Sequence, residues 1–145
     1  MSATNAFETA CLQLYFTNTN HANIGDATGL RSSTAAGVYY ISLHTADPGE
    51  TGTQTTSEAT YTGYARVSVA RGAGWTVSGN NASNTAVVTF GSCTAGTNTI
   101  THFGIGTDIS GAGNLLFSGA VTTPLAVSVL ITPSFAAGEL DTNAD

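Results

Sequence analysis

From Val38 to the C-terminus, apolar residues recur at every second position in short runs that Gly, Pro and Asn separate. Tyr39, Ile41 and Leu43 share one side of such a run, and residues 65–70 and 99–105 alternate in the same way. Successive side chains of a strand point to opposite faces of a sheet. The pattern therefore predicts short strands, each with one face directed to a core.

The rest of this region predicts further strands and the turns between them. The stretch "WTVSGNNASNTAVVTF" over residues 75–90 indicates a hairpin that turns at 79–81 and returns through 86–90. Residues 114–121 and 125–131 predict two more strands, the second with apolar residues at every odd position. We expect a mainly β fold, a jelly-roll-like β-sandwich or barrel of about eight strands with one short N-terminal helix.

That helix is expected over residues 5–16. Asn5 and Glu8 have the spacing of a capping box. An apolar stripe follows at helical spacing, made by Phe7, Cys11, Leu14 and Tyr15. A helix of about three turns is marginal alone in water, so the stripe must dock on the same domain or on a neighbouring subunit.

Residues 17–37 show no period and are rich in turn formers. A connection of this length without regular structure is often functional or ordered by a partner. We expect residues 1–37 to form a helix and extended arm and residues 38–145 to form the β body, together effectively one domain.

Charged residues are only 8% of the chain, and the net charge is −6. The chain has no Lys, and its negative net charge would repel a phosphate backbone. We therefore expect no binding to nucleic acid. No apolar run approaches the length of a membrane span, so we expect no membrane partner. Cys11 and Cys93 have no metal-like spacing; they are read as two free thiols or, alternatively, as one disulfide.

The stretch "YYISLHTADPGETGTQ", residues 39–54, is the best candidate for chemistry. His44 lies close to Asp47 and Glu50 and could be an oriented general base. No particular nucleophile stands beside it, whereas Asp47, Pro48 and Gly49 are strong turn formers. We therefore expect a strand that ends in a turn, and not an enzyme.

Other candidate sites are also weak. The three histidines do not pair at a ligand spacing, so we expect neither a metal nor a cofactor. The Gly-rich stretch 104–114 lacks the helix pattern that completes a phosphate site. Arg66 is expected on the polar side of a strand, where an ion pair with Glu58 is the favoured role and an intersubunit contact the alternative.

Several blocks together resemble a family of small virion structural proteins of tailed bacteriophages. The blocks are "VYYISLHTADPGETGT", "YTGYARVSVAR", "ITHFGIGTDISGAGNLLFSGAV" and "ITPSFAAGELD", in this order over residues 38–142. The chain departs from the family in "CTAGTNT", where some members carry an aromatic residue, and in the low-complexity run "TQTTSEAT".

The resemblance implies a structural role in the virion, with labels divided between capsid decoration and tail-fibre-associated protein. We favour decoration, in which a homo-oligomer (dimer or trimer) made in the host cytoplasm binds the outer surface of the major capsid protein lattice and bridges capsomers. The alternatives are a tail-associated or tail-fibre protein that binds the host surface or carbohydrate, and a small hydrolase, which the lack of site chemistry disfavours.

Contacts with partners are expected from the helix stripe, from residues 17–37 and from the loop after residue 44. The residues expected to make them are Phe7, Leu14, Tyr15, Ile24, Arg31, Thr45, Glu50 and Thr53.

Overall fold

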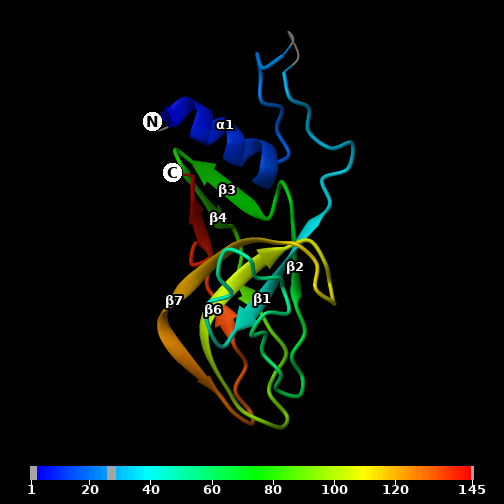
Figure 1. Ribbon diagram of the computed structural model, residues 1–145, viewed down its shortest axis with the longest axis vertical. Helices are drawn as coiled ribbons and strands as arrows, with labels where there is room; N and C mark the ends of the chain where they lie inside the picture. Colours follow the sequence, from blue (N-terminus) through cyan, green and yellow to red (C-terminus); the bar gives the residue numbers. More distant parts are fainter. Residues whose placement is uncertain (1–2, 26–28, 145) are drawn as a thin grey trace. The chain divides into compact units, whose positions relative to one another are not determined.

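The predicted fold class is confirmed by a computed structural model, which describes residues 3–25 and 29–144 and is mainly β with one N-terminal helix (Figure 1). The elements are α1 (Asn5–Phe16), β1 (Val38–His44), β2 (Val67–Ala70), β3 (Trp75–Ser78), β4 (Asn81–Asn84), β5 (Val88–Thr89), β6 (Asn98–Gly106), β7 (Leu115–Val127), β8 (Ser134–Phe135) and β9 (Asp141–Asn143). They form sheets of four, three and two strands.

The elements belong to two compact units, each made of segments far apart in the sequence. Unit 1 comprises Met1–Val38, Ala70–Val87 and Ala136–Asp145, and unit 2 comprises Tyr39–Val69 and Val88–Phe135. The division at residue 37 into an arm and a β body stays a prediction. The contacts of the structure group α1 with a hairpin and with the C-terminal strand.

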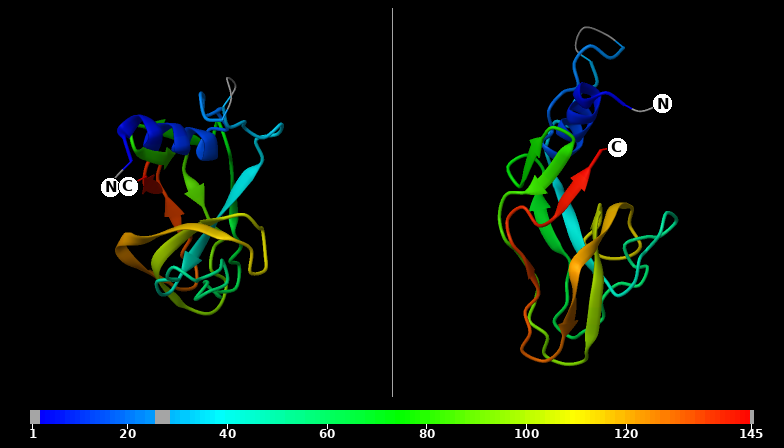
Figure 2. Two further views of the ribbon diagram at one scale, coloured as in Figure 1. Left: turned by 45° about the horizontal axis from the view of Figure 1, so that its top comes forward. Right: turned by 90° about the vertical axis from the view of Figure 1, so that its left-hand side faces the viewer.

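Unit 1 is a three-stranded sheet, in the order β3-β4-β9, against which α1 packs (Figure 2). Leu12 and Phe16 are buried, and the ring of Phe16 lies 4.8 Å from that of Trp75. Asn84 joins β4 to the C-terminal segment, because its amide nitrogen donates to the carbonyl of Ala136 (2.9 Å) and its oxygen accepts from the N–H of Leu140 (2.9 Å). This buried amide thus holds the end of the chain to the hairpin.

The extent of α1 was predicted correctly, but its cap was not. Thr4 is the N-cap, and its hydroxyl accepts from the N–H of Phe7. Asn5 is therefore already inside the helix, and Glu8 is a buried residue one position beyond N3. Either polar residue can cap a helix, so the sequence alone did not decide between them.

The C-terminal end of α1 is held by Arg71. Its guanidinium donates to the carbonyls of Tyr15 (2.6 Å), Leu14 (2.8 Å) and Ala36 (3.0 Å). The carbonyls of Leu14 and Tyr15 belong to the last turn of α1, where carbonyls have no partner inside the helix. A cation near them is also favoured by the helix dipole. Arg71 thereby joins the helix to the end of the irregular segment before β1.

Unit 2 contains the four-stranded sheet, in the order β2-β1-β6-β7, and the two-stranded sheet β5-β8. Direct pairs Ile41–Ile105 and Leu43–Phe103 place apolar side chains on one face of the larger sheet. A chain of aromatic contacts continues this core, with neighbouring ring centroids between 5.5 and 6.2 Å apart. It runs through Tyr61, Tyr64, Phe90, Phe135 and Phe103.

The predicted hairpin in residues 75–90 exists, but its second strand was placed wrongly. Trp75 pairs with Asn84 and Ser78 with Asn81, so the return strand is the polar sequence "NASN". Val88 instead pairs with Phe135 in the other unit's small sheet. Alternation of apolar residues did not identify β4 because only Ala82 and the partnered Asn84 of that strand are buried.

The two strands predicted at 114–121 and 125–131 form one long strand, β7, which ends at Val127. Residues 128–131 form a turn, in which the N–H of Ile131 donates to the carbonyl of Ser128 (2.9 Å). Leu130 has a φ of 74° and is 85% exposed. The apolar alternation beyond residue 127 therefore belongs to an exposed turn and not to the core.

Candidate functional site

The loop after β1 begins with a turn built by the Asp-Pro-Gly sequence. The Oδ1 atom of Asp47 accepts from the N–H of Gly49 (2.9 Å), and the carbonyl of Gly49 accepts from the N–H of Gly52 (3.1 Å). Gly49 has a φ of 68°, a value that costs glycine little and other residues more. The turn directs the chain back across the polar face of the sheet.

His44 fixes the far end of this loop to the sheet. Its Nδ1 lies 2.8 Å from the carbonyl of Thr56, which can only accept, so Nδ1 carries the proton and Nε2 accepts from the hydroxyl of Ser42 (2.8 Å). Both side chains are fully buried. Burial lowers the pKa of His44, although the carbonyl of Thr56 acts in the opposite direction.

The Ser42–His44 pair has the geometry of a hydroxyl and its base, but it is sealed from solvent. A Cβ on Gly104 would lie 2.6 Å from the Ser42 hydroxyl and 2.7 Å from His44 Nε2. Only glycine leaves room for the pair at this point of β6. The hydrogen bonds of the pair tie the loop to β1.

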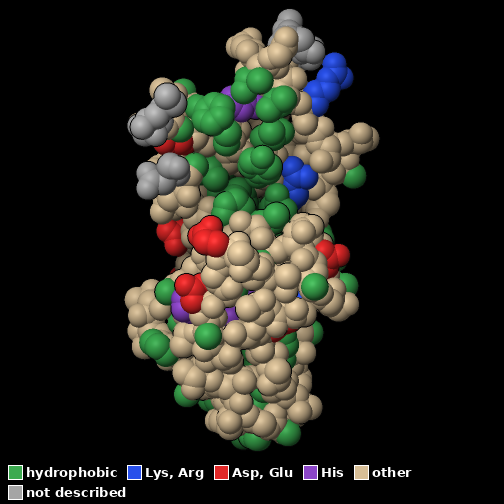
Figure 3. All heavy atoms as spheres, viewed as in Figure 1, with side chains coloured by type: hydrophobic (Ala, Val, Ile, Leu, Met, Phe, Trp, Pro, Cys, Tyr) green, Lys and Arg blue, Asp and Glu red, His purple; other side chains and the backbone are tan. Residues whose placement is uncertain are grey.

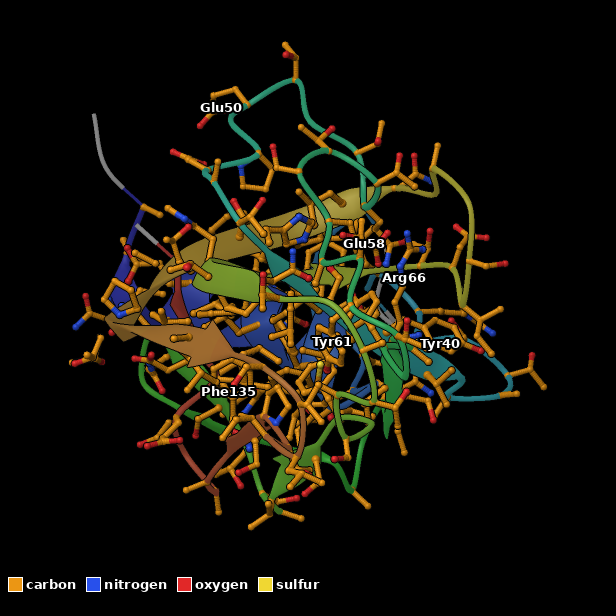
Figure 4. All side chains as sticks on the ribbon, turned by 90° about the horizontal axis from the view of Figure 1, so that it is seen from below. Tyr40, Glu50, Glu58, Tyr61, Arg66 and Phe135 are labelled. Atoms are coloured by element: carbon orange, nitrogen blue, oxygen red, sulfur yellow. The ribbon has the colours of Figure 1, made fainter. Side chains whose placement is uncertain are left out.

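Glu58 and Arg66 are brought together on one side of unit 2 (Figure 4). The Nε and Nη2 atoms of Arg66 each donate to one carboxylate oxygen, both at 2.7 Å. Such bidentate pairs are strong and fixed in direction. The bond to Glu58 raises the pKa of Arg66. Tyr64 also donates to Glu58 (2.8 Å), and burial raises the pKa of this phenol.

Arg66 also holds the loop between β6 and β7. Nη1 donates to the carbonyl of Asp108 (2.9 Å), and Nη2 donates to that of Gly111 (2.8 Å). The sequence indicated the partner Glu58 but not this loop. A guanidinium has five N–H donors, and one carboxylate cannot accept from all of them when the group is buried. This surplus of donors is the one signal that could have predicted further contacts of Arg66.

Gln54 interlocks the two loops. The side chain of Gln54 is fully buried, and its Oε1 accepts from the N–H of Asp108 (2.9 Å). The backbone N–H of Gln54 donates to the carbonyl of Ala112 (2.8 Å). A Cβ on Gly106 or Gly113 would lie within 2.3 Å of the Gln54 side chain. These two glycines thus make room for a side chain that sequence reasoning missed.

An open groove of about 580 Å³ lies between the first loop and β7. Its loop side includes the carboxylates of Asp47 and Glu50, and Glu50 lies on the outer part of the loop in Figure 4. The remaining lining residues are Gly49, Gly52, His102, Leu115, Leu116, Phe117, Ser118, Gly119 and Ala120. Two acidic side chains thus lie beside this open space.

The eight residues expected to contact partners are divided between the two units. Five of them (Phe7, Leu14, Tyr15, Ile24 and Arg31) belong to unit 1, and three (Thr45, Glu50 and Thr53) belong to unit 2. On α1, Phe7 is 48% and Tyr15 53% exposed, while Leu14 is half-buried. Hydrophobic side chains gather over this helix on the face shown in Figure 3.

The described residues contain no group of three or more His, Cys, Asp or Glu that could hold a metal ion. No helix in the part of the chain that the structure describes is long and apolar enough to cross a membrane. Cys11 and Cys93 are free thiols.

The chain was compared with known proteins and protein families. No curated protein matches the chain. The model of a family described as podophage GP4 fiber I protein gp80 matches residues 2–143, which is nearly the whole length. Because the match covers nearly the whole chain, the chain belongs to the podophage GP4 fiber I protein gp80 family, a family of phage virion structural proteins.

Proposed function

We propose that the protein is a component of a phage tail fibre that attaches to a neighbouring virion protein through the exposed face of α1. The observation that carries the proposal is the division of this helix into two faces. Leu12 and Phe16 are buried in unit 1, whereas Phe7 and Tyr15 are about half exposed on the same helix. The family description supplies the fibre context.

The surface of the chain suits such a contact. With charged residues at only 8%, most polar groups are neutral, and these cost less to remove from water than charges do. Aromatic residues on an exposed face are the usual anchors of protein interfaces. The proposal assigns no catalytic role to the chain.

The test is co-sedimentation of the purified protein with phage tails and, separately, with undecorated capsids. We expect saturable binding to tails, and at least tenfold weaker binding for the double variant Phe7→Ser, Tyr15→Ser. The matched control is Val87→Ser, since Val87 is an exposed apolar residue of unit 1 outside α1. Unchanged tail binding by the double variant would contradict the role of α1.

Capsid decoration is the second candidate, favoured by the compact β structure and weakly charged surface. Here the partner would be the outer surface of the major capsid protein lattice, with the chain as a dimer or trimer. Stoichiometric binding to capsids, with greater resistance of the shell to heat, would support it over the fibre. Binding to host cells without either particle would instead assign the protein a host-surface or carbohydrate-binding role.

A further inference from the structure

β7 is an edge strand of the four-stranded sheet, with β6 as its one neighbour. It forms the outer margin of unit 2 on the left of Figure 1. Leu115–Val127 contains no charged residue, and Pro124 falls where residues 121–124 leave the pairing register. Proteins usually protect such an edge with charges, proline or bulges. Here the proline and the longer break in pairing lie in the second half of the strand, and the first half has only the register shift beside Leu115.

The first half, Leu115–Ala120, keeps regular pairing with β6 apart from a shift next to Leu115. Apart from Phe117, these residues make no hydrogen bond beyond that pairing within the described residues. In an antiparallel pair, alternate residues direct their N–H and C=O groups away from the partner. This half of β7 therefore presents backbone donors and acceptors to its outer side.

The groove beside the loop follows this same half-strand. All six residues from Leu115 to Ala120 line it. The groove therefore runs along this half of β7 and reaches His102 of β6. An extended segment is the ligand that fits an open strand edge, because it supplies matching backbone groups.

The opposite wall of the groove determines the charge of that segment. Asp47 and Glu50 are exposed and line the groove, and no Lys or Arg is among the lining residues. A cationic side chain on the segment would find two carboxylates there. We propose that β7 and the loop Asp47–Gly52 form a docking groove for an extended segment of another protein that carries Arg or Lys and adds a strand to the sheet.

A second copy of the chain is a poorer occupant on the same observations. Each copy has a net charge of −6, so bringing two acidic grooves together is opposed by charge. Of the three Arg residues, Arg66 is bound to Glu58 and to a loop, and Arg71 holds the end of α1. The proposal is independent of whether α1 attaches to the tail or to the capsid.

The experiment is an NMR titration of the isotope-labelled full chain with a nine-residue peptide that alternates valine with threonine or arginine. We expect shifts of the backbone amides in Leu115–Ala120 and in Asp47–Gly52. The variant Asp47→Asn, Glu50→Gln keeps the turn acceptor and should bind the peptide about fivefold more weakly at low salt. A Thr55→Ala, Thr60→Ala variant, with both changes at exposed positions outside the groove, is the matched control.

A second peptide separates strand addition from simple charge attraction. The same peptide methylated at every backbone nitrogen keeps its charge but has no backbone donor, and its binding should be lost. Equal binding of the methylated peptide, or shifts confined to other parts of the chain, would overturn the proposal. Broadening of the β7 resonances with protein concentration alone would identify a second copy as the occupant and would overturn it as well.

Discussion

A neutral imidazole inside the sheet makes the stability of unit 2 depend on pH. His44 is fully buried between Ser42 and Thr56, and burial lowers its pKa from the ordinary value of about 6.5. The unfolded chain therefore takes up a proton at a higher pH than the folded chain does. The stabilisation is present above about pH 6.5 and is lost as the pH falls toward the lower folded value.

We expect the midpoint of thermal unfolding to be lower at pH 5 than at pH 7.5. The variant His44→Gln should be less stable than the wild type at pH 7.5, but its midpoint should change less between the two pH values. Calorimetry at both pH values measures this. The same pH dependence in the variant and the wild type would show that another group is responsible.

Leu130 allows a prediction about backbone conformation. The left-handed region costs a non-glycine residue about 1–2 kcal/mol, and the exposed Leu130 side chain offsets little of this by packing. Leu130→Gly removes this cost, but glycine also has more freedom in the unfolded chain, which opposes the gain. The net result should be an increase of about 0.5 kcal/mol in the free energy of unfolding.

Gly49→Ala is the matched reverse change. Gly49 has a similar φ of 68°, and a Cβ added there would meet no other atom within 4 Å. The variant should therefore lower the free energy of unfolding by about 1 kcal/mol through the backbone alone. Urea unfolding measures both variants. A destabilised Leu130→Gly would show that the Leu side chain makes a stabilising contact in solution.

At the residue scale, the sequence carries a local signal for some contacts and none for others. Asp47, Pro48 and Gly49 have known turn preferences, and Arg66 and Glu58 have opposite charges and lie eight residues apart in the sequence. Gln54 and Arg71 gave no such signal, because their partners are backbone carbonyls and amides far away in sequence. Only the folded chain places those groups beside them.

At the scale of elements, α1 shows the limit of a helical stripe. The spacing identified the helix and a stripe of Phe7, Cys11, Leu14 and Tyr15 that was expected to dock on the same domain or on a neighbouring subunit. The residues that the structure buries are Glu8, Leu12 and Phe16. Several apolar residues surround this short helix, so periodicity alone does not identify the face that meets the sheet.

The two faces should differ in their effect on stability. Leu12→Ala and Phe16→Ala should each lower the free energy of unfolding by about 2–5 kcal/mol, because they leave cavities against the sheet. Phe7→Ser should cost about 1 kcal/mol or less, since its ring mainly meets that of His21 (5.4 Å). Fluorescence of Trp75, the one Trp in the sequence, reports unfolding here, and equal costs on both faces would contradict this assignment.

At the scale of the whole molecule, the fold class was predictable, but strand pairing was not. Alternation and turn residues identify strands locally. The pairing of β4 with β9 and of β5 with β8 joins segments separated by more than forty residues. No local sequence pattern indicates which distant strands pair.

This arrangement predicts the effect of removing residues 136–145. Unit 1 would lose β9, and the side-chain oxygen of Asn84 would lose the N–H groups of Gly138 and Leu140, although its Nδ2 keeps the carbonyl of Ala86 (2.7 Å). We expect the truncated chain to lose the helical circular-dichroism signal and the buried Trp75 fluorescence, while the β6 and β7 amides keep their NMR shifts. Native Trp75 fluorescence in the truncated chain would contradict this expectation.

The same arrangement has a consequence for biosynthesis. Leu12 and Phe16 leave the ribosome early, but β3 and β9, which complete the unit that buries them, follow much later. At about 5–20 residues per second, synthesis of residues 17–143 takes roughly 6–25 s. During that time the apolar side of α1 has no native sheet to cover it. Translation speed and the supply of chaperones should therefore influence how much of the nascent chain escapes aggregation.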